Sequence, residues 1–252
     1  MSRSNVRRLG LPLLVFVGLV LVWEAAVPAL RIQPIILPPP SGVAATLVAT
    51  AGPIAFHARH TLVTTLIGFG AAVGLGLLLG FAIGASVTVN DALYPLLVGF
   101  NSIPKAAVVP LLVMWFGIGA APAVLTAFLL AFFPVAVNVA VGLATLESEL
   151  RDVLRVLGAS RWQIFRKVGV PRTMPLFFAS LKVAISSAFV GSVISETVAS
   201  NAGIGYLMAV AASDFNTGLA FGGLFVLAAM GVLLYGVFAV IERRLTGWAY
   251  AE

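Results

Sequence analysis

Long runs of apolar residues restrict the fold of this chain more than any other feature. Six stretches are apolar enough to be candidate spans: residues 9–30, 61–88, 93–116, 122–145, 176–199 and 219–241. A bilayer core about 30 Å thick needs ~20 helical residues, and lipid offers no partner to unpaired backbone groups. We therefore expect an all-α membrane protein with about six transmembrane helices in a single transmembrane domain, residues 1–252.

Composition supports this class and excludes several kinds of chemistry. The chain is 61% hydrophobic and 10% charged, with a mean hydropathy of +1.10, whereas soluble domains carry roughly 25% charged residues. It contains no cysteine, so disulfides, thiolate metal sites and cysteine nucleophiles are excluded. No metal ligands and no catalytic residues are predicted.

Basic residues predict the topology. The third apolar stretch is interrupted by polar residues and prolines, so a re-entrant segment is an alternative to a span. However, arginines precede the first stretch, follow the fourth and follow the sixth, and these clusters share one side only if the third stretch crosses. We therefore place both termini and the 146–175 loop in the cytoplasm. The net charge of +6 then reflects topology and indicates no nucleic-acid partner.

The N-terminal region offers two further interpretations. The first apolar stretch could be a signal peptide, but Pro28 and Arg31 make a poor cleavage context. Residues 31–60 are too polar and broken to span and are expected to form an outer loop, in which Ser41 N-caps a short helix. Gly76, Gly80 and Gly84 then mark a face where another helix can approach closely, within the chain or across a dimer.

The 146–175 loop is the only densely charged interval, with six of the fifteen Lys and Arg residues. Its leucines and valines over 146–157 recur at helical spacing, which predicts an amphipathic helix. Gly158 is expected to close this helix, Ser160 to N-cap a second short helix, and Pro171 to end the second one. The result is a bent helix pair with an apolar face for a partner; the alternative is a merely solvated basic loop.

Here the residues resemble a known family. Asp152, Gly158 six positions later, and Val168-Gly169-Val170-Pro171 resemble the EAA loop of binding-protein-dependent ABC importer permeases. Val153 and Leu154 replace the two alanines of that pattern. Other segments are similar to the nitrate, sulfonate and taurine branch: Leu37-Pro38-Pro39-Pro40-Ser41, Ile103-Pro104-Lys105-Ala106, Pro110-Leu111, Trp115-Phe116-Gly117-Ile118-Gly119 and Gly203-Ile204-Gly205-Tyr206-Leu207.

The resemblance implies a type I ABC importer permease fold and a set of partners. These are a second permease subunit, expected to form a homodimer with a heterodimer as the alternative, cytoplasmic ATP-binding subunits, an extracytoplasmic solute-binding protein and the lipid of a bacterial plasma (inner) membrane. The chain has no Gly-Lys pair and hence no P-loop, so we expect it not to be an enzyme and to hold no cofactor, with ATP and magnesium bound by the partner ATPase. The coupling residues expected are Asp152, Leu154, Leu157, Gly158, Ala159, Ser160, Arg161, Trp162 and Pro171.

Polar residues inside the apolar stretches are candidates for the translocation pathway: Asn101, Ser102, Lys105, Asn138, Ser192, Ser195 and Glu196. For Glu196 a structural or gating role is favoured over substrate contact, because no cationic partner is identifiable. Lys105 follows Pro104, where freed carbonyls could neutralise it. Snorkelling is the alternative for Lys105 and the expectation for Lys182.

Two other function classes were weighed. An intramembrane enzyme would need a nucleophile with a base, or metal ligands, and His57 and His60 are expected to lie outside the spans. A channel or an ion-coupled carrier would also suit broken helices, but neither explains the charged helix pair. The solute stays open among sulfonates, taurine, nitrate and a vitamin precursor.

Overall fold

A computed structural model describes residues 3–144 and 153–249, and these residues are helical with no strand. The elements follow in chain order. They are α1 (Arg3–Ala29), α2 (Pro40–Ala49), α3 (Ala51–Ala85), α4 (Val87–Ser102), α5 (Lys105–Phe116), α6 (Ala120–Ala144), α8 (Arg161–Ile164), a π-helical segment η1 (Phe165–Gly169), α9 (Val170–Ala199), α10 (Ile204–Ser213), α11 (Thr217–Thr246) and a short 3-10 turn η2 (Gly247–Ala249).

Within the described residues, four helical segments are long and apolar enough to cross a membrane, and the bent pair α4 and α5 would make a fifth if it is one span. The part Leu14–Ala29 of α1 is apolar but shorter than these four segments. The all-helical membrane class predicted from the sequence is confirmed, and the six-span count stays a prediction.

The third expected span is not a straight helix. Residues 93–116 contain two helices, α4 and α5, which meet at an angle of 88°. The break lies at Ile103 and Pro104: Ile103 is extended (φ −69°, ψ 127°), as the residue before a proline prefers. Proline has no N–H for the helical ladder, so α4 ends there. The interruption expected at Pro104 is therefore confirmed, and the crossing of the membrane by residues 93–116 stays a prediction.

The outer-loop prediction for residues 31–60 was also wrong in part. Helix α3 begins at Ala51, ten residues before the expected start at residue 61, and therefore includes His57 and His60. Ser41 does not cap α2; the N-cap is Pro39, without a side-chain hydrogen bond. Ser41 instead donates through its backbone N–H and its hydroxyl to the Glu24 carboxylate, at 2.9 and 2.7 Å. Glu24 thus ties α1 to the start of α2.

The glycine stripe of α3 packs on α6 within the same chain. A Cβ added at Gly76, Gly80 or Gly84 would lie 2.6–2.8 Å from the Cβ of Val135, Val139 or Leu143, respectively. Such close backbone approach is possible only without side chains. This resolves the alternative between an internal contact and a dimer contact for these three glycines. The main buried core surrounds this contact, with Ala184, Ile185 and Ala188 contributed by α9.

We call residues 146–171 the coupling segment. Its second half continues directly into α9. Pro171 does not end it, because α8, η1 and α9 follow one another without a break. The π-helical segment supplies a different solution: the N–H of Val170 reaches back to the carbonyl of Phe165. Such bulges accommodate irregularities in the hydrogen-bond ladder, and Pro171 is accepted in the first turn of α9.

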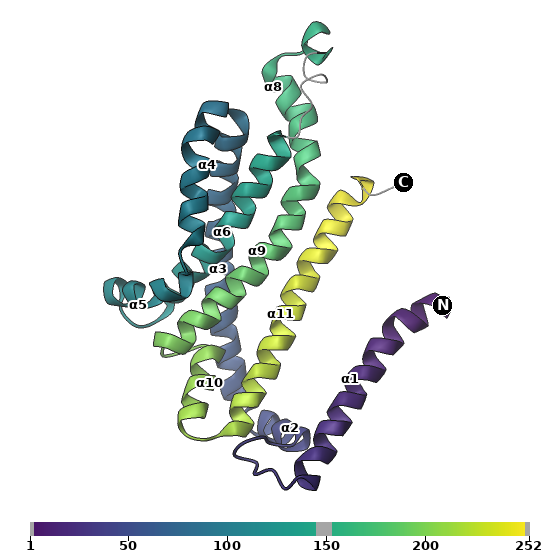
Figure 1. Cartoon of the computed structure of the whole chain (residues 1–252), viewed down its shortest axis with the longest axis vertical. Helices are drawn as coiled ribbons and strands as arrows, with labels where there is room; N and C mark the ends of the chain where they lie inside the picture. The colour runs from purple at the N-terminus through teal and green to yellow at the C-terminus, as the bar shows by residue number, and fades with distance from the viewer. Residues whose placement is uncertain (1–2, 145–152, 250–252) are drawn as a thin grey trace.

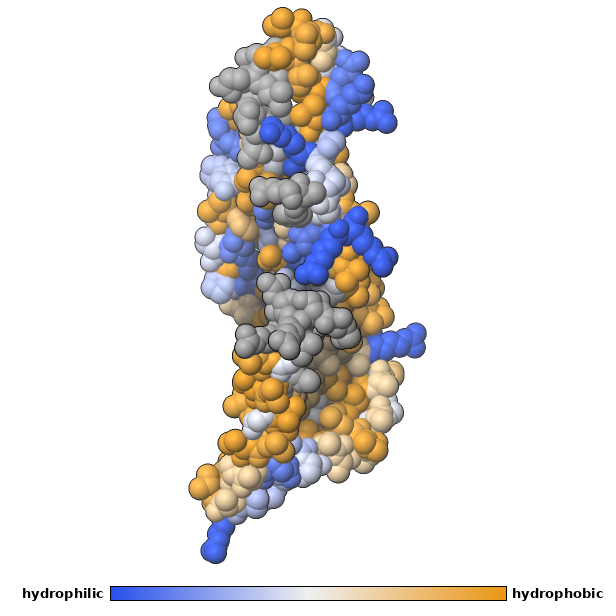
Figure 2. Space-filling model, turned by 90° about the vertical axis from the view of Figure 1, so that its right-hand side faces the viewer, coloured by the Kyte–Doolittle hydropathy of each residue, from blue (hydrophilic) through white to orange (hydrophobic). Residues whose placement is uncertain are grey.

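Different helices lie at the two ends of the molecule. Figure 1 shows α8 at one end, and α2 and α10 near the other; α1 leads from the N-terminus toward the α2 end, and α11 leads back toward the C-terminus. The cytoplasmic placement of both termini stays a prediction. On the face in Figure 2, hydrophilic residues gather in the half that carries α8, and the opposite half is mainly hydrophobic.

Candidate functional site

The coupling segment contains a helix end and a helix start in direct succession. Gly158 has φ +82°, and the N–H groups of Ala159 and Gly158 bond to the carbonyls of Leu154 and Arg155, which is the Schellman pattern. Ser160 and Gln163 then cap each other's backbone N–H, at 2.8 and 3.2 Å. The predicted roles of Gly158 as helix closer and Ser160 as N-cap are confirmed.

Apolar side chains on this segment face solvent. Val156, Leu157 and Trp162 are 88%, 76% and 65% exposed, whereas Leu154, Ala159 and Pro171 are partly buried. The Trp162 ring stacks on Phe165, which meets Phe81 of α3 edge-on. The segment thus presents an apolar surface and is anchored to the helix bundle. Asp152 and the beginning of the first helix lie outside the described residues.

The polar residues at the α4–α5 break lie together. The Lys105 ammonium donates to the carbonyls of Phe100 and Asn101, and to the Asn101 side chain at 3.1 Å. These carbonyls belong to the last turn of α4, which favours a cation. Carbonyls at the break thus accept from Lys105, and its place near the translocation pathway stays a prediction. Asn101 and Ser102 are exposed.

Of the other pathway candidates, Asn138 is partly buried and the three on α9 are fully buried. Asn138 donates to the carbonyl of Pro134, one turn earlier in α6. Ser192, Ser195 and Glu196 on α9 are at most 1% exposed. The structure does not place these three on an exposed surface, which favours the structural role over substrate contact.

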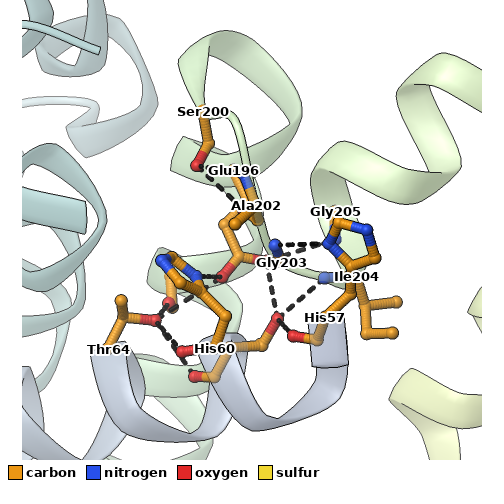
Figure 3. Close-up of polar contacts among 11 residues, drawn as sticks. His57, His60, Thr64, Glu196, Ser200, Ala202, Gly203, Ile204 and Gly205 are labelled. Atoms are coloured by element: carbon orange, nitrogen blue, oxygen red, sulfur yellow. Dashed lines mark hydrogen bonds and ion pairs between the residues drawn. The ribbon is translucent and has the colours of Figure 1, made fainter. Parts of the chain in front are cut away.

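Glu196 is the buried centre of a polar cluster, which we define as His57, His60, Thr61, Thr64, Ser192 and Glu196. The two histidines are partly exposed and the other four residues are buried; Figure 3 shows the contacts around Glu196. The Glu196 carboxylate accepts from the hydroxyls of Thr61 (2.8 Å) and Thr64 (3.5 Å), and from the Gly205 N–H (3.1 Å). The Nδ1 atom of His60 lies 3.7 Å away. A buried carboxylate is tolerated only when it is hydrogen-bonded, and here the donors come from α3 and α10.

The polar cluster also caps the start of α10. Three successive N–H groups there bond to side chains of other helices: Gly203 to His57 Nδ1 (3.1 Å), Ile204 to the Thr61 hydroxyl (2.9 Å) and Gly205 to Glu196. The N-cap residue Gly203 has φ +107° and no side chain to cap with. The free N–H groups of a helix start need partners, and α3 and α9 supply them.

Comparison with known proteins identifies the family. Residues 72–247 match the family described as "Binding-protein-dependent transport system inner membrane component". The chain belongs to this family. The matched range contains the coupling segment, α9 and α10, whereas the α3 residues of the polar cluster precede it.

Named relatives support the same assignment. The inner membrane component is 31% identical to the formylaminopyrimidine transport permease protein ThiX of Halalkalibacterium halodurans, over 94% of this chain and 95% of the relative. It is 34% identical to the riboflavin transport system permease protein RibX of Chloroflexus aurantiacus (98% and 93%), and 31% identical to the taurine transport system permease protein TauC of Escherichia coli (91% and 86%). The chain is a multi-pass inner membrane permease subunit of an ABC importer.

A solved structure shows the same fold. A chain from inward-facing conformations of the MetNI methionine ABC transporter superposes with a TM-score of 0.64 at 20% identity, over 74% of the inner membrane component and 93% of that chain.

Sequence reasoning missed several residues that the structure brings together. His57, His60 and Thr61 were assigned to the outer loop or its edge, yet they contact Glu196 or α10. Their spacing of three to four residues on one helix face was the available signal. An ion pair was missed as well: the Lys182 ammonium of α9 lies 2.5 Å from the Glu242 carboxylate of α11. The expected snorkelling of Lys182 stays a prediction.

Proposed function

We propose that this permease subunit forms the translocation pathway for a small solute and couples to a separate ATPase through residues 146–171. The observation that carries the proposal is the geometry of the described part of this segment. Gly158 and Ser160 fix a rigid bend, and exposed Val156, Leu157 and Trp162 supply the apolar surface that helix-in-groove docking needs.

A continuous helical path connects this bend to the interior. Helices α8 and α9, with η1 between them, run from the exposed tip to the buried Glu196 without a chain break. A rigid helix transmits displacement along its axis. Movement of the bend at Gly158 and Ser160 would therefore displace the opposite end of α9, where Glu196 lies. This favours an ATP-driven permease over a channel or an ion-coupled carrier, which requires no such arm.

The expected assembly follows from the family. The family is defined by dependence on a binding protein, and we propose a homodimer of permease subunits, embedded in lipid, with two cytoplasmic ATP-binding subunits that hold ATP and magnesium. No cofactor is expected in this chain. Both termini are expected to lie in the cytoplasm.

The solute is proposed by class only. Relatives of similar identity are named for formylaminopyrimidine, riboflavin and taurine, and another, 28% identical, for aliphatic sulfonates. We propose a small organic solute of the sulfonate or vitamin-precursor kind, selected by the solute-binding protein. The Lys105 ammonium already donates to carbonyls of α4, which argues against a role of Lys105 in binding an anionic solute.

The test is co-purification followed by an activity measurement. The tagged chain is expressed with its ATPase partner, and hydrolysis is measured in vesicles with the binding protein and taurine, an alkanesulfonate, riboflavin or formylaminopyrimidine. We expect co-purification of an ATPase and stimulation by one of these solutes. Solute flux without any ATPase would support the channel or carrier alternative instead.

A further inference from the structure

The polar cluster joins three helices at the end of the molecule opposite α8 (Figures 1 and 3). Glu196 belongs to α9, its hydroxyl donors Thr61 and Thr64 belong to α3, and its N–H donor Gly205 belongs to α10. A second contact reinforces the first: the hydroxyls of Thr64 and Ser192 lie 2.6 Å apart. One carboxylate therefore holds α9, the following helix α10, and α3, which is more than a hundred residues away in the sequence.

Separation of these helices would be costly. Thr61, Thr64, Ser192 and Glu196 are at most 2% exposed, and a buried charged group that loses its partners is strongly destabilising. Next to Ser192, α9 also packs closely on α6, because a Cβ at Gly191 would lie 2.8 Å from the carbonyl oxygen of Thr126 in α6. These buried hydrogen bonds therefore favour an arrangement in which α3, α9 and α10 stay together.

We propose that Glu196 is a positioning residue whose carboxylate locks the outer ends of α3, α9 and α10 into one rigid body that stays closed throughout the transport cycle. Opening toward the outside then occurs at other contacts. The inference rests on the proposed function, because it assigns the polar cluster to the outer side and presumes a cycle driven by the ATPase.

Thr61 offers a matched pair of variants. Its hydroxyl donates to Glu196 and accepts from the Ile204 N–H. Thr61→Val keeps the shape but removes both bonds, and Thr61→Ser keeps both. Glu196→Ala and Glu196→Gln form a second pair, because the amide oxygen of glutamine can still accept from Thr61 and Gly205.

The first readout is transport in vesicles by the assembled complex, with whichever of the four solutes above the wild type transports. Thr61→Val and Glu196→Ala are expected to lower transport and solute-stimulated hydrolysis by about tenfold or more, as the loss of buried hydrogen bonds implies. Basal hydrolysis per assembled complex is expected to stay unchanged, and the Ser and Gln variants to stay near wild type. Wild-type stimulation in Thr61→Val would overturn the proposal.

The second readout is a disulfide cross-link between two introduced cysteines. The chain has no cysteine of its own that could compete in this reaction. In a Thr64→Cys/Ser192→Cys variant, oxidation should join α3 to α9 and leave transport within about twofold of the reduced protein. Loss of transport on oxidation, restored by reductant, would show that the contact opens and would overturn the proposal. Failure to cross-link would contradict the contact itself. Absence of solute stimulation in the wild type would instead overturn the proposed function.

Discussion

The hydroxyl of Thr61 donates a hydrogen bond of 2.8 Å to the carboxylate of Glu196, a residue 135 positions later in the chain. The same hydroxyl accepts from the N–H of Ile204 at 2.9 Å. Through this one side chain, α3 satisfies a buried acid on α9 and an unpaired donor at the start of α10. The end of the permease opposite the coupling segment is therefore held by specific polar contacts as well as by apolar packing.

A substitution at Gly203 should disturb this end. Its φ of +107° is unfavourable for residues with a side chain, and an added Cβ would overlap the Glu196 carboxyl group. Gly203→Ala is expected to lower the thermal unfolding temperature of the detergent-solubilised protein by several degrees. Gly70→Ala, where a Cβ meets nothing within 4 Å, is the control and should leave it nearly unchanged.

The contact between α3 and α6 gives a second prediction. A Cβ at Gly80 would lie 2.6 Å from the Val139 Cβ and 2.7 Å from the Ala136 carbonyl oxygen. Gly80→Ala should therefore destabilise the fold, by about 1–3 kcal/mol for an overpacked core. Gly74→Ala, on the same helix with open space around it, should be neutral or slightly stabilising. Equal loss of stability in both variants would contradict the packing described.

The ion pair between Lys182 and Glu242 connects α9 to α11, with side chains 21% and 9% exposed. Lys182→Ala leaves the Glu242 carboxylate without this cation, and removal of one partner of a buried pair is more harmful than removal of both. The Lys182→Ala/Glu242→Ala double variant should therefore be more stable than Lys182→Ala. Thermal unfolding of the four proteins in a double-mutant cycle measures the coupling. Additive effects would show that the two residues do not interact.

Much of the local structure was predictable where one chemical requirement dominates. Apolar length predicted a helical membrane protein, and glycine at residue 158 with serine at residue 160 predicted the bend, because each rule depends on neighbouring residues only. The interruption at the α4–α5 break was predictable from Pro104, but the 88° angle between the two helices was not. Sidedness constrains where a segment ends and says little about how it bends at Pro104.

The polar cluster was not predictable, because its contacts depend on tertiary structure. Glu196 was recognised as unusual, but its donors Thr61 and Thr64 look like ordinary helix residues until α3 is placed against α9. The early start of α3 had the same cause: residues 51–60 include Gly52, Pro53 and two histidines, a composition typical of a loop. Packing against α2, α10 and α11 stabilises that helix despite weak local preference.

The most direct test of the coupling function is ATP hydrolysis by the reconstituted complex with Gly158 replaced. Gly158 has φ +82° and open space around it, so Gly158→Val strains the backbone, by about 1–2 kcal/mol, without a steric clash. Gly158→Asn is the control, since asparagine tolerates this conformation. We predict that Gly158→Val inserts and assembles normally but loses solute-stimulated hydrolysis and transport, while Gly158→Asn retains both. Full solute-stimulated hydrolysis in Gly158→Val would contradict the account.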